Sequence, residues 1–255
     1  MMPPPMLSAS LAGLRVLLTR PREEGVEEWA AAFVLAGAVP LAYPTIVITP
    51  PESWQALDEA MARLKSYDWM VFTSQTAVDF FGNRLPTGQF PAGMRPKIAA
   101  VGRRTALAIQ LRGARVALVA TDSRQEGLVE ALRDLPPGAR ILCPLAASGR
   151  PLLVQSLRAR GCIVDVVTVY RIEPRTNLPA PPEFDVATFA SPSALRAFVK
   201  GLGPQALAEK AVAVIGPTTA EEAKLSGLIT VVAETPDVDA LILAIAQSRS
   251  NQGGT

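Results

Sequence analysis

The sequence predicts an α/β protein made of two similar lobes, each a doubly wound parallel sheet of the flavodoxin-like type, joined by a two-stranded β linker. Two observations support this fold class. Short apolar runs alternate with helical patterns along the chain, and patterns of the first half recur in the second. Apolar runs without polar alternation are typical of parallel strands that helices cover on both faces.

In the first half, each strand pattern is followed by a helical pattern. Runs rich in β-branched and other apolar residues predict strands at 15–19, 39–48, 69–73, 98–101 and 115–119. Helical spacing of apolar residues predicts helices in the gaps, at 23–36, 53–65, 76–82, 104–112 and 125–132. Because one helix separates each pair of strands, we expect parallel pairing.

The second half follows the same plan. Its apolar runs predict strands at 140–143, 163–171, 186–189, 212–215 and 229–232. The matching helices are expected at 150–160, 193–201, 218–225 and 238–247.

Five sequence blocks occur twice in the same order. They pair 13–18 with 138–143, 36–39 with 160–163, 68–74 with 185–191, 101–105 with 215–219, and 118–122 with 231–235. The offset between partners drifts slowly, from 125 residues in the first pair to 113 in the last. Such ordered self-similarity indicates an internal duplication.

Two apolar runs, Pro40–Ile48 and Val164–Glu173, are longer than the other strands and occupy matching places in the two copies. A strand too long for one sheet can cross to another domain. We therefore expect 43–46 and 168–171 to be linker strands, domain one to comprise 8–42 and 172–255, and domain two to comprise 47–167.

Composition narrows the functional class. The chain is 49% hydrophobic with a net charge of +2, so it favours neither a nucleic-acid surface nor a membrane protein. The uncharged stretch 29–51 is broken by glycine and three prolines, and 1–10 does not read as a signal peptide. Cys143 and Cys162 are expected to be buried thiols in a reducing cytoplasm.

The sequence contains no histidine, which removes the commonest general base and zinc ligand. Neither a G-x-G-x-x-G turn after a strand nor a Walker A sequence is present, so nucleotide binding has no support. We expect no metal and no cofactor, and chemistry that relies on tyrosine, hydroxyl groups, carboxylates or backbone dipoles.

Polar residues follow the predicted strands at the edge where parallel sheets bind ligands. The candidates are Arg20, Ser74, Gly102, Thr105, Ser191, Gly216, Thr218 and Thr219. Free amides at helix N-termini accept anions, so two such edges favour a large polyanion. Any single serine or threonine here is more often only a helix cap, and arginines here can be solvated.

Tyr170 lies in the second predicted linker strand, where the first copy has Ile46. A tyrosine in a strand usually serves packing. In a chain without histidine, however, this phenol is the best-placed general acid.

Five motifs resemble those of uroporphyrinogen-III synthases in order and spacing. They are Thr73–Val78, Val101–Ala106, Tyr170–Arg171, Ser191–Ala194 and Ile215–Ala220. The resemblance covers about Leu11 to Gln247. It implies two α/β lobes joined by a two-stranded linker and a hydro-lyase of tetrapyrrole biosynthesis, which leads to heme, siroheme, chlorophyll and cobalamin.

The resemblance also implies the substrate, hydroxymethylbilane, whose carboxylates match the predicted donors. In that family the substrate loses its hydroxyl as water, ring D attacks through its substituted carbon, and a spiro intermediate rearranges to invert ring D. Tyr170 would assist hydroxyl departure, and the other candidates would hold acetate and propionate groups. A monomer that receives substrate from hydroxymethylbilane synthase is expected.

The alternative is a non-catalytic two-lobed small-molecule-binding or regulatory protein, because such proteins also duplicate an α/β lobe. The tyrosine in the linker strand favours the enzyme.

Overall fold

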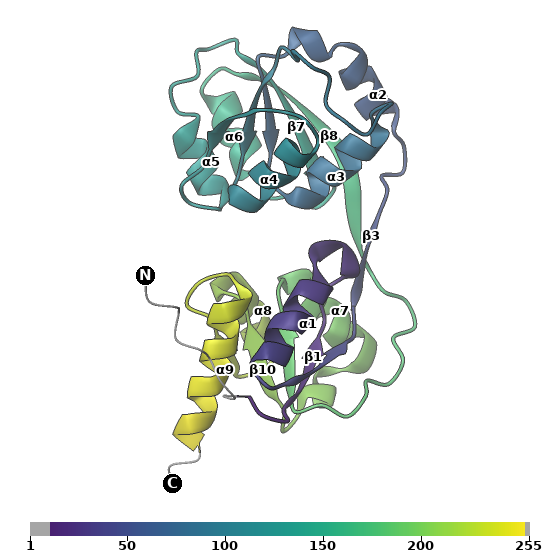
Figure 1. Ribbon diagram of the computed structural model, residues 1–255, viewed down its shortest axis with the longest axis vertical. Coiled ribbons are helices and arrows are strands. Elements are labelled where there is room, and N and C mark those ends of the chain that lie inside the picture. The colour runs from purple at the N-terminus through teal and green to yellow at the C-terminus, as the bar shows by residue number, and fades with distance from the viewer. Residues whose placement is uncertain (1–10, 253–255) are drawn as a thin grey trace. The chain divides into compact units, whose positions relative to one another are not determined.

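The computed structural model describes residues 11–252, and it divides the chain into two compact units (Figure 1). Unit 1 combines the described residues up to Ile48 with those from Glu173 onward, and unit 2 comprises Thr49–Ile172. The two ends of the chain therefore build one unit, and the middle builds the other. The outer limits expected for domain one, 8 and 255, lie outside the described residues.

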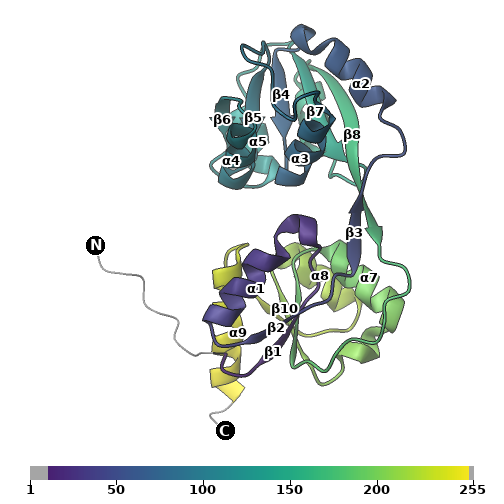
Figure 2. The same ribbon diagram turned by 45° about the vertical axis from the view of Figure 1, so that its right-hand side comes forward.

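The sheet of unit 1 has five parallel strands in the order β11-β10-β9-β1-β2. These strands are β1 (Arg15–Leu18), β2 (Val39–Ala42), β9 (Val186–Phe189), β10 (Ala211–Val214) and β11 (Thr230–Val232). The helices are α1 (Val26–Leu35), α7 (Pro192–Leu202), α8 (Pro217–Leu225) and α9 (Val238–Gln252), with short 3₁₀ turns at Arg22–Glu24 and Pro204–Leu207. Figure 2 shows α1 and α9 on one side of this sheet and α7 on the other.

The core of unit 1 joins both ends of the described chain. Trp29 and Phe33 of α1 are buried in one cluster with Leu241, Ile242 and Ile245 of α9. These side chains cover the face of the sheet that carries Val16 and Leu18. Burial of several large apolar side chains contributes about 1.5–3 kcal/mol each, so α1 and α9 stabilise the unit together.

The second sheet has the order β3-β8-β7-β4-β5-β6, and its β8-β7-β4-β5-β6 pairings are parallel. Its strands are β3 (Ile46–Thr49), β4 (Trp69–Phe72), β5 (Lys97–Ala100), β6 (Val116–Val119), β7 (Arg140–Ala146) and β8 (Ile163–Pro174). The helices are α2 (Gln55–Ala62), α3 (Gln75–Arg84), α4 (Arg103–Leu111), α5 (Gln125–Ala131) and α6 (Leu152–Ala159), with a 3₁₀ turn at Leu64–Ser66.

The five parallel strands of each unit follow the same spatial order. In unit 1 the spatial order is β2-β1-β9-β10-β11, so the first strand of the chain lies between the second and the third. In unit 2 the spatial order is β8-β7-β4-β5-β6, which is the same arrangement when β7 is counted as the first strand and β8 as the second. This is the flavodoxin-like order. The α/β class with parallel sheets is thereby confirmed. The common origin of the halves stays a prediction, which the matching strand orders support.

In each sheet an aspartate bonds the start of one central strand to the start of its neighbour in the same way. In unit 1, Asp185 accepts a hydrogen bond from the backbone N–H of Arg15 at 2.8 Å, and it also binds the Arg15 guanidinium at 2.9 and 3.2 Å. In unit 2, Asp68 accepts from the backbone N–H of Arg140 at 2.9 Å. Both aspartates precede the third strand and both arginines begin the first, so the repeated blocks place equivalent residues at equivalent positions.

The single strand expected at 39–48 is wrong, because the structure has two strands there. β2 ends at Ala42 and β3 begins at Ile46, in the other sheet. Between them Pro44 has no N–H to donate to a ladder. On either side of Pro44 the backbone still pairs with the end of β1. The N–H of Tyr43 donates to Leu18 C=O, and the N–H of Thr45 donates to Thr19 C=O.

Unit 2 contains one helix without a counterpart in unit 1. α2 lies between β3 and β4, whereas no helix separates β8 from β9. The offset between repeated blocks falls from 124 to 117 across this same interval. The extra helix thus accounts for the largest step in the offset.

Both cysteines are buried free thiols within unit 2. Cys143 is fully enclosed in the core with Ile141 and Leu145, and burial raises the pKa of its thiol to about 12. Among the described residues, no helix has the length and hydropathy needed to cross a bilayer.

We predict that Asp185→Asn weakens the acid sensitivity of folding. The hydrogen bonds from Arg15 lower the pKa of the Asp185 carboxyl. The pair therefore stabilises the fold above the ordinary aspartate pKa of about 3.9, and this contribution is lost as pH falls through the lowered value. Denaturant titrations at several acidic pH values should show a steeper loss of stability in the native protein than in the variant. Equal slopes would contradict the prediction.

Candidate functional site

In unit 2 the predicted residues gather where β4 and β5 end, side by side in the sheet. Ser74 is the N-cap of α3, and its Oγ accepts a hydrogen bond from the N–H of Ala77 at 3.0 Å. Gly102 is the N-cap of α4. Two helix N-termini therefore open at one edge of this sheet, each with free amides that favour an anion.

Tyr170 reaches the same edge from β8. Its hydroxyl lies 3.2 Å from Ser74 Oγ, and its ring stacks on Phe80 of α3 at 5.8 Å between centroids. The side chain is 6% exposed. A strand residue is thus fixed against the first turns of α3 by one hydrogen bond and one aromatic contact.

A β-bulge in β8 helps to place this tyrosine. β8 pairs in register with β7 until Leu145 faces Thr168, but the next residue of β7, Ala146, faces Tyr170. Val169 is the extra residue, and both Val169 and Tyr170 are buried, which breaks the alternation of the strand. Bulges often re-aim a side chain in this manner.

In unit 1 the predicted residues follow β1, β9 and β10, which are neighbours in the sheet. Ser191 is the N-cap of α7; its Oγ accepts from Ala194 N–H at 3.2 Å and lies 3.0 Å from Ser193 Oγ. Gly216 is the N-cap of α8. The arrangement repeats that of unit 2, although the capping serine here meets a second serine instead of a tyrosine.

Arg20 follows β1 and is held inside unit 1 by two groups. Its guanidinium carbon lies 4.4 Å from the ring centre of Trp29, and its Nη2 lies 3.9 Å from Glu24. Only 14% of the side chain is exposed. Burial raises the pKa of the Glu24 carboxyl. Neither partner of Arg20 is evident from the sequence pattern alone, although Glu24 stands at i,i+4 spacing from it.

The threonines divide by accessibility. Thr105 and Thr219 are 4% and 3% exposed in the first turns of α4 and α8, whereas Thr218 is exposed. The burial of the first two favours packing as the role of their side chains. The neighbouring backbone amides and Thr218 remain available to a ligand.

The edge of unit 2 is electropositive at α4. Arg103 and Arg104 open this helix and both are exposed, at an end where the helix dipole disfavours cations. Arg124 and Arg150 lie near the same edge, but each pairs with a carboxylate, Asp122 and Glu126 respectively. The charges of Arg103 and Arg104 lie at the same helix end as the first-turn amides.

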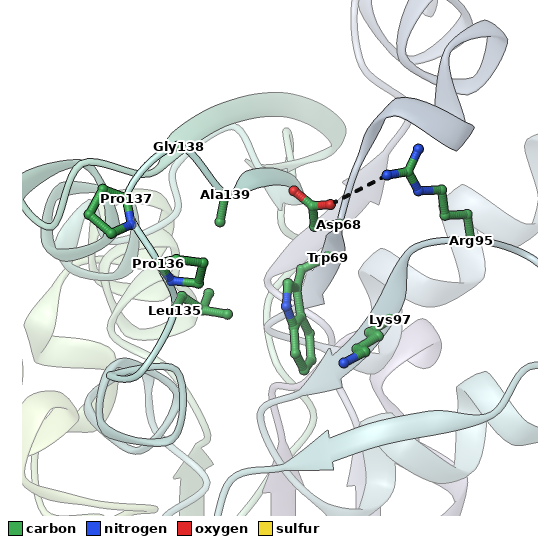
Figure 3. Close-up of a pocket in the computed structure, with 9 residues that line it drawn as sticks. All are labelled: Asp68, Trp69, Arg95, Lys97, Leu135, Pro136, Pro137, Gly138 and Ala139. Carbon is green, nitrogen blue, oxygen red and sulfur yellow. Dashed lines mark ion pairs between the residues drawn. The ribbon is translucent and has the colours of Figure 1, made fainter.

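One pocket of unit 2 lies apart from the predicted residues, and another adjoins their edge of the sheet. The first, of about 550 Å³, lies at the opposite edge of the sheet, where β4, β5 and β7 begin (Figure 3). It is lined by Asp68, Trp69, Arg95, Lys97 and residues 135–139. The other, of about 460 Å³, lies beside α5 and is lined by Asp122, Glu126, Glu130, Arg133 and Asp134. Three of its carboxylates pair with arginines, in the pairs Asp122–Arg124, Glu126–Arg150 and Glu130–Arg133.

The functional groups at the two sheet edges are hydroxyls, backbone amides, guanidinium groups and one phenol. Over residues 11–250, whose side chains are placed, no group of three histidine, cysteine, aspartate or glutamate residues has a metal-binding arrangement. The edges can therefore hold carboxylates and deliver a proton from Tyr170.

Comparison with known proteins gives one consistent result. Residues 27–243 match the sequence model of the family described as uroporphyrinogen-III synthase HemD. The uroporphyrinogen-III synthase of Synechococcus elongatus is 30% identical over 259 residues, which cover 95% of this chain and 98% of that one. The Escherichia coli enzyme is 29% identical over 62% of this chain.

Solved structures with the same fold carry the same description. A mutant uroporphyrinogen III synthase of Thermus thermophilus has a TM-score of 0.63 at 20% identity, covering 94% of this chain and 100% of that one. The Helicobacter pylori uroporphyrinogen-III synthetase has a TM-score of 0.62 at 19% identity, covering 92% and 99%.

We predict that Gly102→Ala destabilises unit 2 while Gly216→Ala leaves unit 1 nearly as stable. Both glycines are extended N-caps, so both substitutions have the same capping effect. A Cβ at Gly102 meets Ser123 Oγ at 2.6 Å and Cβ at 3.2 Å, whereas a Cβ at Gly216 meets nothing within 4 Å. We expect the unfolding free energies of the variants to differ by about 1–2 kcal/mol in denaturant titrations. Equal values would show that Ser123 moves aside without cost.

Proposed function

Because this chain belongs to the uroporphyrinogen-III synthase family, we propose that the carboxyl edges of its two sheets hold hydroxymethylbilane while Tyr170 assists loss of the substrate hydroxyl. The activity of the family is established: the enzyme is a hydro-lyase of heme and tetrapyrrole biosynthesis that cyclises hydroxymethylbilane. The proposal concerns which residues of this chain perform the work. A non-catalytic binding or regulatory role is not favoured.

The observation that carries the proposal is the position of the Tyr170 hydroxyl, 3.2 Å from the N-cap of α3. Helix N-termini stabilise negative charge. A phenol held there can give up its proton more readily, and a carboxylate of the substrate can bind beside it. Proton donor and anion-binding amides thus occur at one edge of unit 2.

Substrate carboxylates are assigned to both sheet edges. In unit 2 they would meet the first-turn amides of α3 and α4, next to Ser74, Gly102 and Thr105. In unit 1 they would meet Arg20 and the first turns of α7 and α8, which comprise the positions Ser191, Gly216, Thr218 and Thr219. The open space at Gly216 supports this assignment, because packing gives no reason for a glycine there.

The reaction requires one proton for the departing hydroxyl and a fixed orientation of the substrate. The phenol of Tyr170 protonates the departing hydroxyl, a pyrrole nitrogen supplies the electron pair that breaks the C–O bond, and water leaves. The substituted carbon of ring D then attacks the electron-poor carbon, and rearrangement with loss of a proton closes the inverted ring. The protein must favour this attack over direct closure at the unsubstituted carbon, which is a task of orientation.

The domain boundaries, the oligomeric state and the compartment of the protein are also proposed. We assign 43–46 and 168–171 to the linker between domains, with domain one at 8–42 and 172–255 and domain two at 47–167. A monomer in the cytoplasm is proposed, and the buried free thiols of Cys143 and Cys162 support a reducing compartment. Direct receipt of hydroxymethylbilane from its synthase would shorten the time in which the substrate can cyclise unaided.

Isomer analysis tests the function of the chain. Purified protein is mixed with freshly made hydroxymethylbilane, the products are oxidised to porphyrins, and the type I and type III isomers are separated. We expect type III to dominate at a rate proportional to enzyme. Type I at the rate without protein would overturn the assignment.

We predict that Tyr170→Phe lowers kcat by about 10²-fold, the low end for loss of one general acid. Tyr67→Phe is the matched control in the same unit, because the Tyr67 hydroxyl donates to Asp165 and takes no part in the proposed reaction. Turnover is measured after correction for the folded fraction. If folded Tyr170→Phe turns over as fast as the control, Tyr170 is not the acid.

A further inference from the structure

Ser74 makes two contacts through one hydroxyl group. Its Oγ accepts a hydrogen bond from Ala77 N–H at 3.0 Å and lies 3.2 Å from the Tyr170 hydroxyl. A serine hydroxyl has one proton to donate and two lone pairs to accept with. With the amide bond already accepted, its own proton remains available for Tyr170.

The N-terminus of α3 sets the direction of this second bond. The positive end of the helix stabilises negative charge, so it favours the order in which Ser74 donates and the oxygen of Tyr170, which becomes a phenolate when its proton leaves, accepts. An Oγ that accepts from an amide is also a stronger donor, because chained hydrogen bonds polarise one another. The favoured order is Ala77 N–H to Ser74 Oγ, and Ser74 O–H to Tyr170 Oη.

We infer that Ser74 is the positioning residue of Tyr170: its hydroxyl donates to the phenol and relays the N-terminal field of α3 to it, so the phenolic proton is not used in the bond to Ser74. This inference rests on the proposed role of Tyr170 as the acid. It replaces direct carboxylate binding by the Ser74 side chain. In this arrangement the Ser74 hydroxyl stabilises the phenolate that forms when the proton leaves.

Phe80 completes the arrangement from the same helix. Its ring stacks on Tyr170 with an angle of 25° between the planes, which limits rotation of the phenol. Asp79 of α3 accepts from Arg112, and Arg171 of β8 donates to Pro50 C=O and Glu52. Ser74 and Phe80 thus both contact Tyr170 from α3.

The capping serine of unit 1 provides a matched control. Ser191 accepts from Ala194 N–H, as Ser74 does from Ala77, but its Oγ meets Ser193 Oγ. Replacement of either serine by alanine removes one N-cap bond, with similar cost to the fold. Only the change at Ser74 should alter Tyr170.

The first measurement needs no substrate. The chain has three tyrosines, and burial raises the pKa values of Tyr43 and Tyr67. Ultraviolet titration of the native protein minus Tyr170→Phe isolates the ionisation of Tyr170. The titration of Ser74→Ala minus that of the double variant Ser74→Ala/Tyr170→Phe isolates Tyr170 in the absence of the serine hydroxyl. We expect this pKa of Tyr170 to be higher by about 1, because a hydrogen bond to the phenolate is lost.

The controls for this titration separate the relay from a general loss of structure. Ser191→Ala should leave the pKa of Tyr170 unchanged, and Ser74→Thr, which keeps a hydroxyl, should restore it. If Ser74→Ala folds poorly, Ser74→Gly removes the hydroxyl at a smaller capping cost. An unchanged Tyr170 pKa in a folded variant that lacks the hydroxyl overturns the inference.

Kinetics supply the second measurement. Ser74→Ala should lower kcat by about 10-fold, the effect of a pKa change of about 1, with KM little changed. In the Tyr170→Phe background it should cause no further loss, because residues that act as a unit are not additive. Additive losses, or a rise in KM alone, would show that Ser74 binds substrate directly and would overturn the inference.

The two proposals fail in different ways. A changed pKa of Tyr170 together with full activity of Tyr170→Phe would keep the relay and remove Tyr170 as the acid. An unchanged pKa together with a large loss in Tyr170→Phe would keep the acid and remove the relay.

Discussion

The fold depends on pairing between strands that are far apart along the chain. β1 lies beside β9, and the Arg15–Asp185 contact that closes this pair joins residues 170 positions apart. In unit 2 the Arg140–Asp68 contact does the same for β7 and β4, over 72 positions. Each sheet is complete only when its central pair forms. The covering helices and the loops of the candidate site follow from that pairing.

Because β2, β1, β9, β10 and β11 of unit 1 run in parallel, as do β8, β7, β4, β5 and β6 of unit 2, the strand-to-helix turns of each unit open at the same edge. Local chemistry then distinguishes the turns. Ser74 and Ser191 cap their helices through the same hydrogen bond, yet the first meets a phenol and the second another serine. Gly102 is packed against Ser123, whereas Gly216 borders open space. Matching positions in the two units thus have different surroundings.

Much of this architecture is predictable from the sequence, because parallel strands that are buried on both faces consist of continuous runs of apolar residues. Seven of the ten expected strands end within a residue of their observed bounds, whereas β7 and β8 each run three residues further than expected and the run 39–48 is divided into two strands. The flavodoxin-like expectation agrees with the observed strand order. The break at Pro44 was missed because apolar residues continue on both sides of it. The sequence also gave no sign of the bulge at Val169, since a bulge is a property of pairing with Ala146 and not of composition. For the same reason the contacts of Tyr170 with Ser74 and Phe80, and of Arg20 with Trp29, emerged only in three dimensions.

The construction of unit 1 from both ends of the chain affects how the protein is made. During synthesis β1 and β2 leave the ribosome long before β9, which pairs with β1 in the sheet, has been made. At the usual elongation rate of about 5–20 residues per second, the delay is on the order of 7–30 seconds. Unit 2 is continuous in sequence and can fold during this time. Until β9 is made, β1 lacks one of its two neighbours, so the sheet of unit 1 is completed only after most of the chain has been synthesised.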